Sequence, residues 1–157
     1  MQKNWQVGSL FGIPLYIDTS WFLILAFVTL IDAGDVNASG LSGGQLWLGW
    51  ITGLIMALLL FGSVLLHELG HSLVARSQGI TVNSITLFLF GGVASIDRES
   101  KTPEEAILVA IAGPIVSLTL FGLFWGLTLI SGENKLLSFI TGDLARINFL
   151  LALFNLI

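Results

Sequence analysis

Both histidines of this 157-residue chain lie in one five-residue run, His67-Glu68-Leu69-Gly70-His71. On a helix, side chains four positions apart lie on one face, about 6 Å apart along the axis. Two imidazoles placed in this way can bind one tetrahedral Zn²⁺ at about 2.0–2.1 Å. The run therefore predicts a zinc site with His67 and His71 as ligands.

Glu68 follows the first histidine directly, so its carboxylate can reach a zinc-bound water without binding the metal. Zinc lowers the pKa of such a water to about 7. A carboxylate can then accept the proton and later deliver it to a leaving amine. Gly70 is expected to leave room beside the helix for a substrate backbone. The pattern predicts a metalloendopeptidase with Glu68 as the catalytic residue.

The same run can occur on a soluble helix that binds no metal, with both histidines solvated. Here residues 46–66 precede it, and they contain no charged side chain. An acidic residue at the centre of a membrane helix costs about 2.5–3.5 kcal/mol on insertion scales, so a compensating role is expected.

The composition is that of a membrane protein, with the lipid bilayer as its surroundings. The chain is 55% hydrophobic and 10% charged, with a mean hydropathy of +0.93. Soluble domains carry about 25% charged residues. The net charge of −4 argues against a nucleic-acid partner, which would need a basic surface. With no cysteine, the chain cannot form a thiolate zinc site or a disulfide.

Long uncharged runs predict about four transmembrane or membrane-embedded helices, together with a short β-hairpin or sheet element. We expect a mainly α fold that forms one membrane-embedded core domain over residues 1–157, without a separate regulatory domain. The expected helices cover residues 15–31, 46–66 with the histidine run, 106–132, and 136–157 as one helix or two pieces. Residues 5–17 are expected to form one or two surface strands, 32–45 a loop, and 80–96 a strand pair broken by Gly91-Gly92.

Three polar features carry more local expectations. Thr102-Pro103-Glu104-Glu105 is typical of a helix start, with Thr102 as the cap and Glu105 completing a capping box. Asp143 and Arg146 are spaced to pair on one helix face. Asp18 is either an interface residue or the cap of the first helix.

The basic residues predict an orientation. Lys3, Arg76, Arg98 and Lys101 fall on one side of the expected membrane domain, and Lys135 falls on the other. The positive-inside rule places the first side in the cytoplasm. We therefore expect a multi-pass protein of the cell (inner) membrane, with its first segment retained and its active site toward the cytoplasm.

Three further motifs accompany the histidine run in a fixed order: Phe90-Gly91-Gly92-Val93-Ala94, Ala112-Gly113-Pro114 with Ser117, and Phe154-Asn155-Leu156-Ile157. Together they resemble the site-2 protease family of intramembrane zinc metalloproteases, over nearly the whole chain. The resemblance implies regulated intramembrane proteolysis of a single-pass membrane protein substrate, with Zn²⁺ as the cofactor.

The resemblance also implies roles for three residues outside the histidine run. Asn155 would position substrate or the oxyanion, and the alternative is a packing amide between helices. Gly91 and Gly92 would let a substrate strand approach, although an ordinary hairpin turn explains them equally well. Gly113-Pro114 more often means a kink or a close helix contact than chemistry.

The chain departs from the family pattern at its end. The family's final motif continues to a Leu-Asp-Gly step whose aspartate is the third zinc ligand, whereas this sequence stops at Ile157. Asp97 and Asp143 are poor substitutes. We therefore expect a domain incomplete at its C-terminus, either a shortened form of an active enzyme or a fragment with impaired catalysis. The alternative function is a zinc-binding membrane protein without protease activity, such as a transporter, an inactive homologue or a scaffold.

Overall fold

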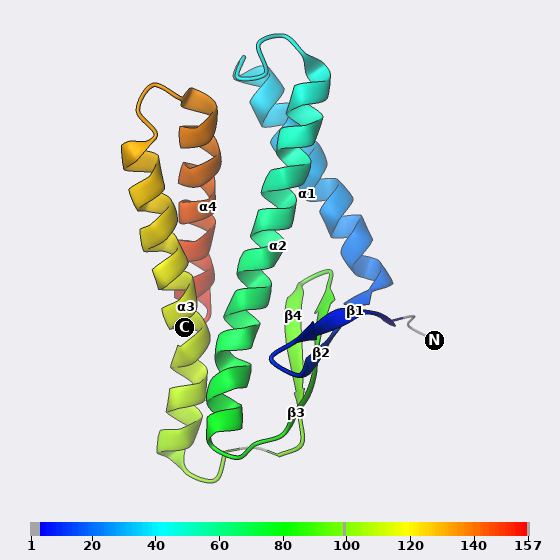
Figure 1. The fold of residues 1–157 in the computed structure, drawn as a ribbon, viewed down its shortest axis with the longest axis vertical. Helices are drawn as coiled ribbons and strands as arrows, with labels where there is room; N and C mark the ends of the chain where they lie inside the picture. Colours follow the sequence, from blue (N-terminus) through cyan, green and yellow to red (C-terminus); the bar gives the residue numbers. More distant parts are fainter. Residues whose placement is uncertain (1–3, 99, 157) are drawn as a thin grey trace.

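The computed structural model describes residues 4–98 and 100–156 and contains four long helices and one small sheet (Figure 1). Lys3, part of the orientation argument, and Ile157, the last residue of the final motif, lie outside the described residues. The elements in chain order are β1 (Asn4–Leu10), β2 (Ile13–Asp18), α1 (Thr19–Ala38), α2 (Leu46–Ser77), β3 (Val82–Phe88), β4 (Gly91–Ile96), α3 (Pro103–Ile130) and α4 (Lys135–Phe154).

All four helices of the described residues are long and apolar enough to cross a membrane. The shortest, α1 and α4, have 20 residues each, which matches the length needed for a bilayer core of about 30 Å. Large apolar side chains are exposed along all of them, Leu23, Trp50, Leu129 and Phe149 among them. The mainly α fold class and its multi-pass membrane character are confirmed.

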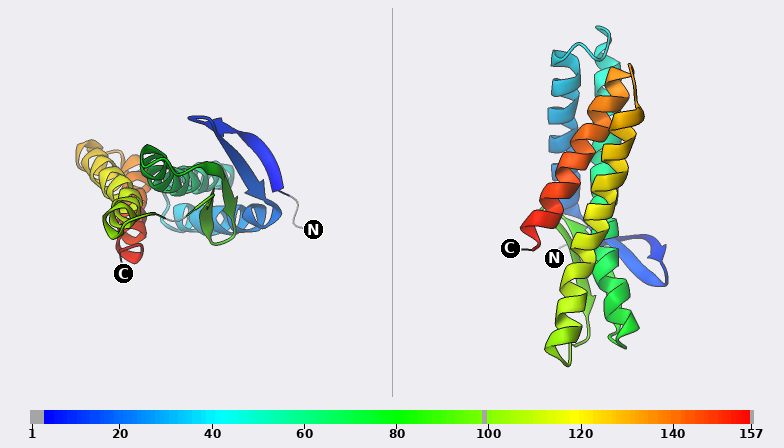
Figure 2. Two further views of the ribbon diagram at one scale, coloured as in Figure 1. Left: turned by 90° about the horizontal axis from the view of Figure 1, so that it is seen from below. Right: turned by 90° about the vertical axis from the view of Figure 1, so that its left-hand side faces the viewer.

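The helices form two antiparallel pairs that meet along α2. α1 packs against α2 on one side, while α3 packs against both α2 and α4 on the other (Figures 1 and 2). Glycine brings the first pair close together, because a Cβ at Gly53 would lie 2.7 Å from the backbone of Thr29 and Ala33. Small residues serve this purpose at many membrane helix contacts.

The strands form one four-stranded sheet rather than two separate surface elements. β1 with β2 and β3 with β4 are antiparallel hairpins, and β2 pairs with β3 in parallel, with Tyr16 opposite Thr86. This parallel pairing joins residues that are 70 positions apart. The sheet lies beside the C-terminal half of α2, on the side away from α3 and α4 (Figure 2).

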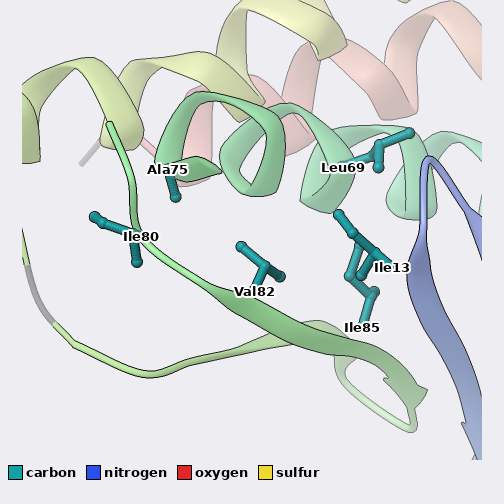
Figure 3. Packing of buried hydrophobic residues seen from close by; sticks show 6 residues of the cluster. All are labelled: Ile13, Leu69, Ala75, Ile80, Val82 and Ile85. Atoms are coloured by element: carbon teal, nitrogen blue, oxygen red, sulfur yellow. The ribbon is translucent and has the colours of Figure 1, made fainter. Parts of the chain in front are cut away.

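A cluster of aliphatic side chains fixes the sheet to α2 (Figure 3). Ile13 from β2 and Ile85 from β3 point toward Leu69, which sits within the histidine run, and Ile85 is completely buried. Ile80 and Val82 pack beside them, toward Ala75. Because Leu69 lies between Glu68 and the second histidine, this cluster fixes the segment of α2 that carries the histidine run beside the strands.

Several expected boundaries were wrong. Residues 15–18 belong to β2, and α1 begins at Thr19, with the Asp18 carboxylate accepting the Ser20 backbone N–H at 2.8 Å. Most of the expected loop at 32–45 is helical, because α1 continues to Ala38 with Ala33 and Val36 fully buried. Gly91 and Gly92 do not break a strand, since the turn lies at Leu89-Phe90 and the two glycines begin β4.

Other local expectations were confirmed. The Thr102 hydroxyl accepts the Glu105 N–H at 3.2 Å at the start of α3. The Glu105 carboxylate reaches the N–H of Lys101 at 2.9 Å, one residue before the position that a standard capping box uses. α4 is one continuous helix, and Asp143 and Arg146 pair on its surface.

Candidate metal centre

The two histidines converge within the membrane domain. α2 runs unbroken through the motif, so His67 and His71 lie one turn apart on one face. Their Nε2 atoms are 3.1 Å apart, and their rings meet at 77° with centroids 4.8 Å apart. His67 is 1% exposed and is thereby shielded from bulk solvent, and His71 is half-buried.

The other nitrogen of each ring is held by α3. His71 Nδ1 lies 2.7 Å from the carbonyl oxygen of Val109, and His67 Nδ1 lies 2.9 Å from the Ser117 hydroxyl. A carbonyl only accepts, so His71 must carry its proton on Nδ1 and present a lone pair at Nε2. If His67 donates to Ser117 in the same way, both Nε2 lone pairs point at one place. Such outer contacts orient histidine ligands in metal sites.

Gly113 on α3 provides the space in front of these nitrogens. A Cβ at this position would lie 2.2 Å from His71 Nε2 and 2.6 Å from His67 Nε2. Any other residue would therefore fill the place where the two lone pairs meet. The expectation for Gly113-Pro114 included a close helix contact, and the structure shows one, made with the histidines themselves.

These observations fit a zinc ion. Two ligands of a tetrahedral zinc at about 2.0–2.1 Å are about 3.3–3.4 Å apart, close to the observed 3.1 Å. Within residues 4–98 and 100–156, no group of three His, Cys, Asp or Glu side chains is placed to hold a metal. Glu68 is therefore not a third ligand in this arrangement. Asp143 instead pairs with Arg146, and Asp97 accepts from Asn83, so neither substitutes for one.

Glu68 lies on the side of α2 that faces the sheet. Gly92 of β4 is so close that a Cβ there would lie 2.5 Å from Glu68 Cγ. Glu68 also lines a cavity together with His71 and the residues of β4. The carboxylate is half-buried between the histidine pair and the beginning of this strand, where a reacting peptide bond could reach both.

Asn155, Gly91 and Gly92, the other expected site residues, lie at different distances from the histidines and Glu68. Asn155 is the C-cap of α4, and its side chain lies near enough to His67 to interact with the ring. Its amide also donates to the Leu151 carbonyl at 2.7 Å. Gly91 has a φ of +131°, which favours glycine, and its nearest side chain is Val64 at 4.0 Å. The strand beside Glu68 thus depends on Gly92 more directly than on Gly91.

Gly70 has a packing role that the sequence did not indicate. A Cβ there would meet Val116 Cγ2 at 2.8 Å and the Ala112 carbonyl oxygen at 3.0 Å. Gly70 therefore lets α3 approach α2 closely, while the room for substrate expected beside it stays a prediction. This close packing of α3 is what brings Gly113 and Ser117 to the histidines.

Sequence reasoning missed two contributors to the site. Val109 acts through its backbone carbonyl, which any residue could supply, so its identity carries no signal. Asn148 is completely buried and donates to Ser63 Oγ at 3.1 Å, joining α4 to α2 one turn before His67. Its signal was available as an amide within an apolar helix, which commonly indicates a contact between membrane helices.

Comparison with known proteins gives a consistent result. The family model for peptidase family M50 matches residues 55–155. A protein of Synechocystis sp., sll0528, whose assigned name is that of a zinc metalloprotease, is 58% identical over 161 residues, which cover 100% of this chain and 41% of that protein. Zinc metalloprotease MJ0392 of Methanocaldococcus jannaschii is 35% identical over 117 residues, 74% of this chain and 30% of its own.

A solved structure shows the same fold. The site-2 protease from Methanocaldococcus jannaschii superposes with a TM-score of 0.67 and 29% sequence identity, covering 99% of this chain and 65% of that one. The chain thus spans less than half the length of either curated relative.

Proposed function

The chain belongs to peptidase family M50, the site-2 protease family of zinc metalloproteases, and on that premise we propose that it forms the core of an intramembrane protease. The observation that carries the proposal is the convergence of His67 and His71 Nε2, 3.1 Å apart, in the space that Gly113 leaves open.

His67 and His71 would hold the zinc, with Ser117 and the Val109 carbonyl fixing the orientation of their rings. Bound zinc would supply a Lewis acid and lower the pKa of an attacking water. Glu68 would accept the proton of that water and then donate it to the amide nitrogen of the leaving peptide. The family resemblance implies an aspartate as the third ligand.

The strand β4 would bind the substrate. It is an outer strand of the sheet, pairing only with β3 among the described strands, and its first residues lie against Glu68. A transmembrane helix must be extended before its peptide bonds can be cut, and addition to a strand edge stabilises the extended form. Gly91 and Gly92 would allow close approach, and Asn155 beside His67 would position the scissile carbonyl.

The partner would be a single-pass membrane protein, and the site would face the cytoplasmic side. Arg76, Arg98 and Lys101 lie at the end of the bundle formed by the C-terminus of α2 and the N-terminus of α3 (Figure 1). Lys135 lies at the opposite end, at the start of α4. The positive-inside rule then gives this orientation, in a cell (inner) membrane.

The test is cleavage of single-pass reporter proteins by the full-length protein in liposomes, comparing wild type with Glu68→Gln. We expect cleavage only by wild type, with equal zinc content in both. Equal cleavage by Glu68→Gln would overturn the assignment of Glu68. Zinc bound without any cleavage dependent on Glu68 would favour the zinc-binding protein without protease activity.

A further inference from the structure

A cavity of about 200 Å³ lies between β4 and the facing sides of α2 and α3. It begins at Glu68 and His71 and extends along the strand past Ala94 to Ile96. Ala75 and Ser72 of α2 and Val109 of α3 complete its walls. The cavity is smaller than the roughly 300–1,000 Å³ that drug-sized ligands occupy, so its size suits a single amino-acid side chain.

Away from Glu68 and His71, which close one end, the walls of the cavity are alanine, valine and isoleucine side chains with Gly92 and Ser72. The apolar walls favour an apolar occupant and penalise a charged one. Ser72 is the polar residue of this part of the lining; it is 1% exposed, and its Oγ has no hydrogen-bond partner among the described residues. A buried hydroxyl without a hydrogen-bond partner is unfavourable unless a bound group pairs with it. Ser72 could therefore form a hydrogen bond with those occupants that carry a hydroxyl group.

The register of β4 relates this cavity to an added strand. Leu87 lies opposite Gly92 and Ile85 opposite Ala94, and both partners in β3 are buried on the face toward α2. Alternate residues of a strand face the same side, so Gly92 and Ala94 share that face. A substrate strand on the outer edge of β4 would direct every second side chain toward α2, where the cavity lies.

We propose that this cavity binds one substrate side chain next to the scissile bond and selects for small aliphatic or hydroxyl-bearing residues there. Ala94 and Ala75 set its size, and Ser72 contacts the hydroxyl of a bound threonine or serine. The inference rests on the proposed function, because it assumes that Glu68 and β4 act on one extended substrate.

The first test measures size selection. Single-pass reporters carrying Ala, Leu, Phe or Lys at each position near the cut site are incubated with full-length wild type and Ala94→Leu. A methylene that does not fit changes selectivity by about 10- to 200-fold. We expect the ratio of leucine to alanine reporter kcat/KM to fall at least about 10-fold in Ala94→Leu, at one position only.

Ser95→Leu is the matched control, since Ser95 is exposed and lies next to Ala94 on the opposite face of β4. It should leave the ratio as in wild type. An unchanged ratio in Ala94→Leu, or the same fall in Ser95→Leu, would overturn the pocket while leaving Glu68-dependent cleavage intact. If wild type cleaved none of the reporters, that result would instead contradict the proposed function.

A second test does not require activity, and it remains informative if Ala94→Leu fails to fold. The chain has no cysteine, so Ser72→Cys introduces a single thiol into the cavity. The test uses the Glu68→Gln background and reporters that each carry one cysteine activated as a thiopyridyl disulfide. The thiol introduced by Ser72→Cys should attack this disulfide, form a mixed disulfide with the reporter and release thiopyridone. We expect this exchange from one substrate position only. Exchange at every position alike, or faster exchange with Ser95→Cys, would contradict the proposal.

Discussion

The hydroxyl of Ser117 lies 2.9 Å from His67 Nδ1, although the two residues are 50 positions apart and on different helices. Ser117 is itself completely buried, so the contact is protected from water. This pair links the tilt of the His67 ring to the placement of α3 against α2, and the metal affinity should depend on it.

Ser117→Ala should therefore weaken zinc binding by about 10- to 100-fold, the effect usual for the outer partner of a metal-bound histidine. Competition with a chelator of known affinity measures the change. Thr119→Ala is the control, because the Thr119 hydroxyl bonds to the carbonyl of Ile115 in its own helix. Equal zinc affinity in both variants would show that Ser117 does not orient His67.

Gly113→Ala should abolish zinc binding, since its Cβ would lie within 2.6 Å of both histidine Nε2 atoms. Gly122→Ala on the same helix has no neighbour within 4 Å of the added atom. That variant should bind zinc normally, and the higher helix propensity of alanine could raise stability by up to about 1 kcal/mol. Full zinc occupancy in a folded Gly113→Ala protein would contradict the geometry of the site.

The buried bond from Asn148 to Ser63 should couple α4 to α2. A double-mutant cycle with Asn148→Ala and Ser63→Ala, followed by unfolding in detergent, should give a coupling energy of about 1 kcal/mol. The single variants should also lower zinc affinity if α4 shifts and moves Asn155 away from His67. Strict additivity in unfolding would mean that the hydrogen bond does not fix the position of α4.

The carboxyl group of Asp18, which lies outside the membrane segments, should make the stability of the folded protein depend on pH. Hydrogen bonds from the side chain and then the backbone N–H of Ser20 lower the pKa of its carboxyl below 3.8. A lowered folded-state pKa contributes stability above the unfolded-state value, and this stability is lost as the pH falls through the folded-state value. Wild type should thus lose more stability in acid than Asp18→Asn, which keeps a capping oxygen but does not titrate.

Thermal unfolding at a series of pH values measures this difference. Asp18→Ala should be less stable than both at neutral pH, because the start of α1 loses its cap. The cap is also tied to the sheet, since the Leu89 N–H donates to Ser20 Oγ at 3.1 Å. If the unfolding temperatures of wild type and Asp18→Asn fell by the same amount in acid, the lowered pKa of Asp18 would be contradicted.

The sequence predicted the parts of this fold that depend on neighbours in the chain. His67 and His71 share one face of α2, with Glu68 turned from it toward the sheet, because residues 46–66 continue into them as one uninterrupted helix. The end of α1 was missed because Asp32, Asp35 and Asn37 interrupt the apolar run. The helix nevertheless continues, since packing of Ala33 against Gly53 of α2 outweighs the local polarity.

The contacts that complete the site depend on helix register, which no local pattern specifies. Ser117 and Val109 contact the histidines only because α3 packs closely against Gly70 in one particular register along α2. Similarly, turn signals predict each hairpin, but nothing near Tyr16 indicates that it pairs with Thr86 in parallel. The sequence thus indicated the candidate ligands more readily than the groups that orient them.

The most direct test of the metal centre is the zinc content of the detergent-purified protein, determined by elemental analysis for wild type and His71→Ala. We expect about one zinc per chain in wild type and loss of it in His71→Ala, since one of two converging nitrogens is removed. Equal zinc content in the two proteins would contradict the assignment of His67 and His71 as the ligands.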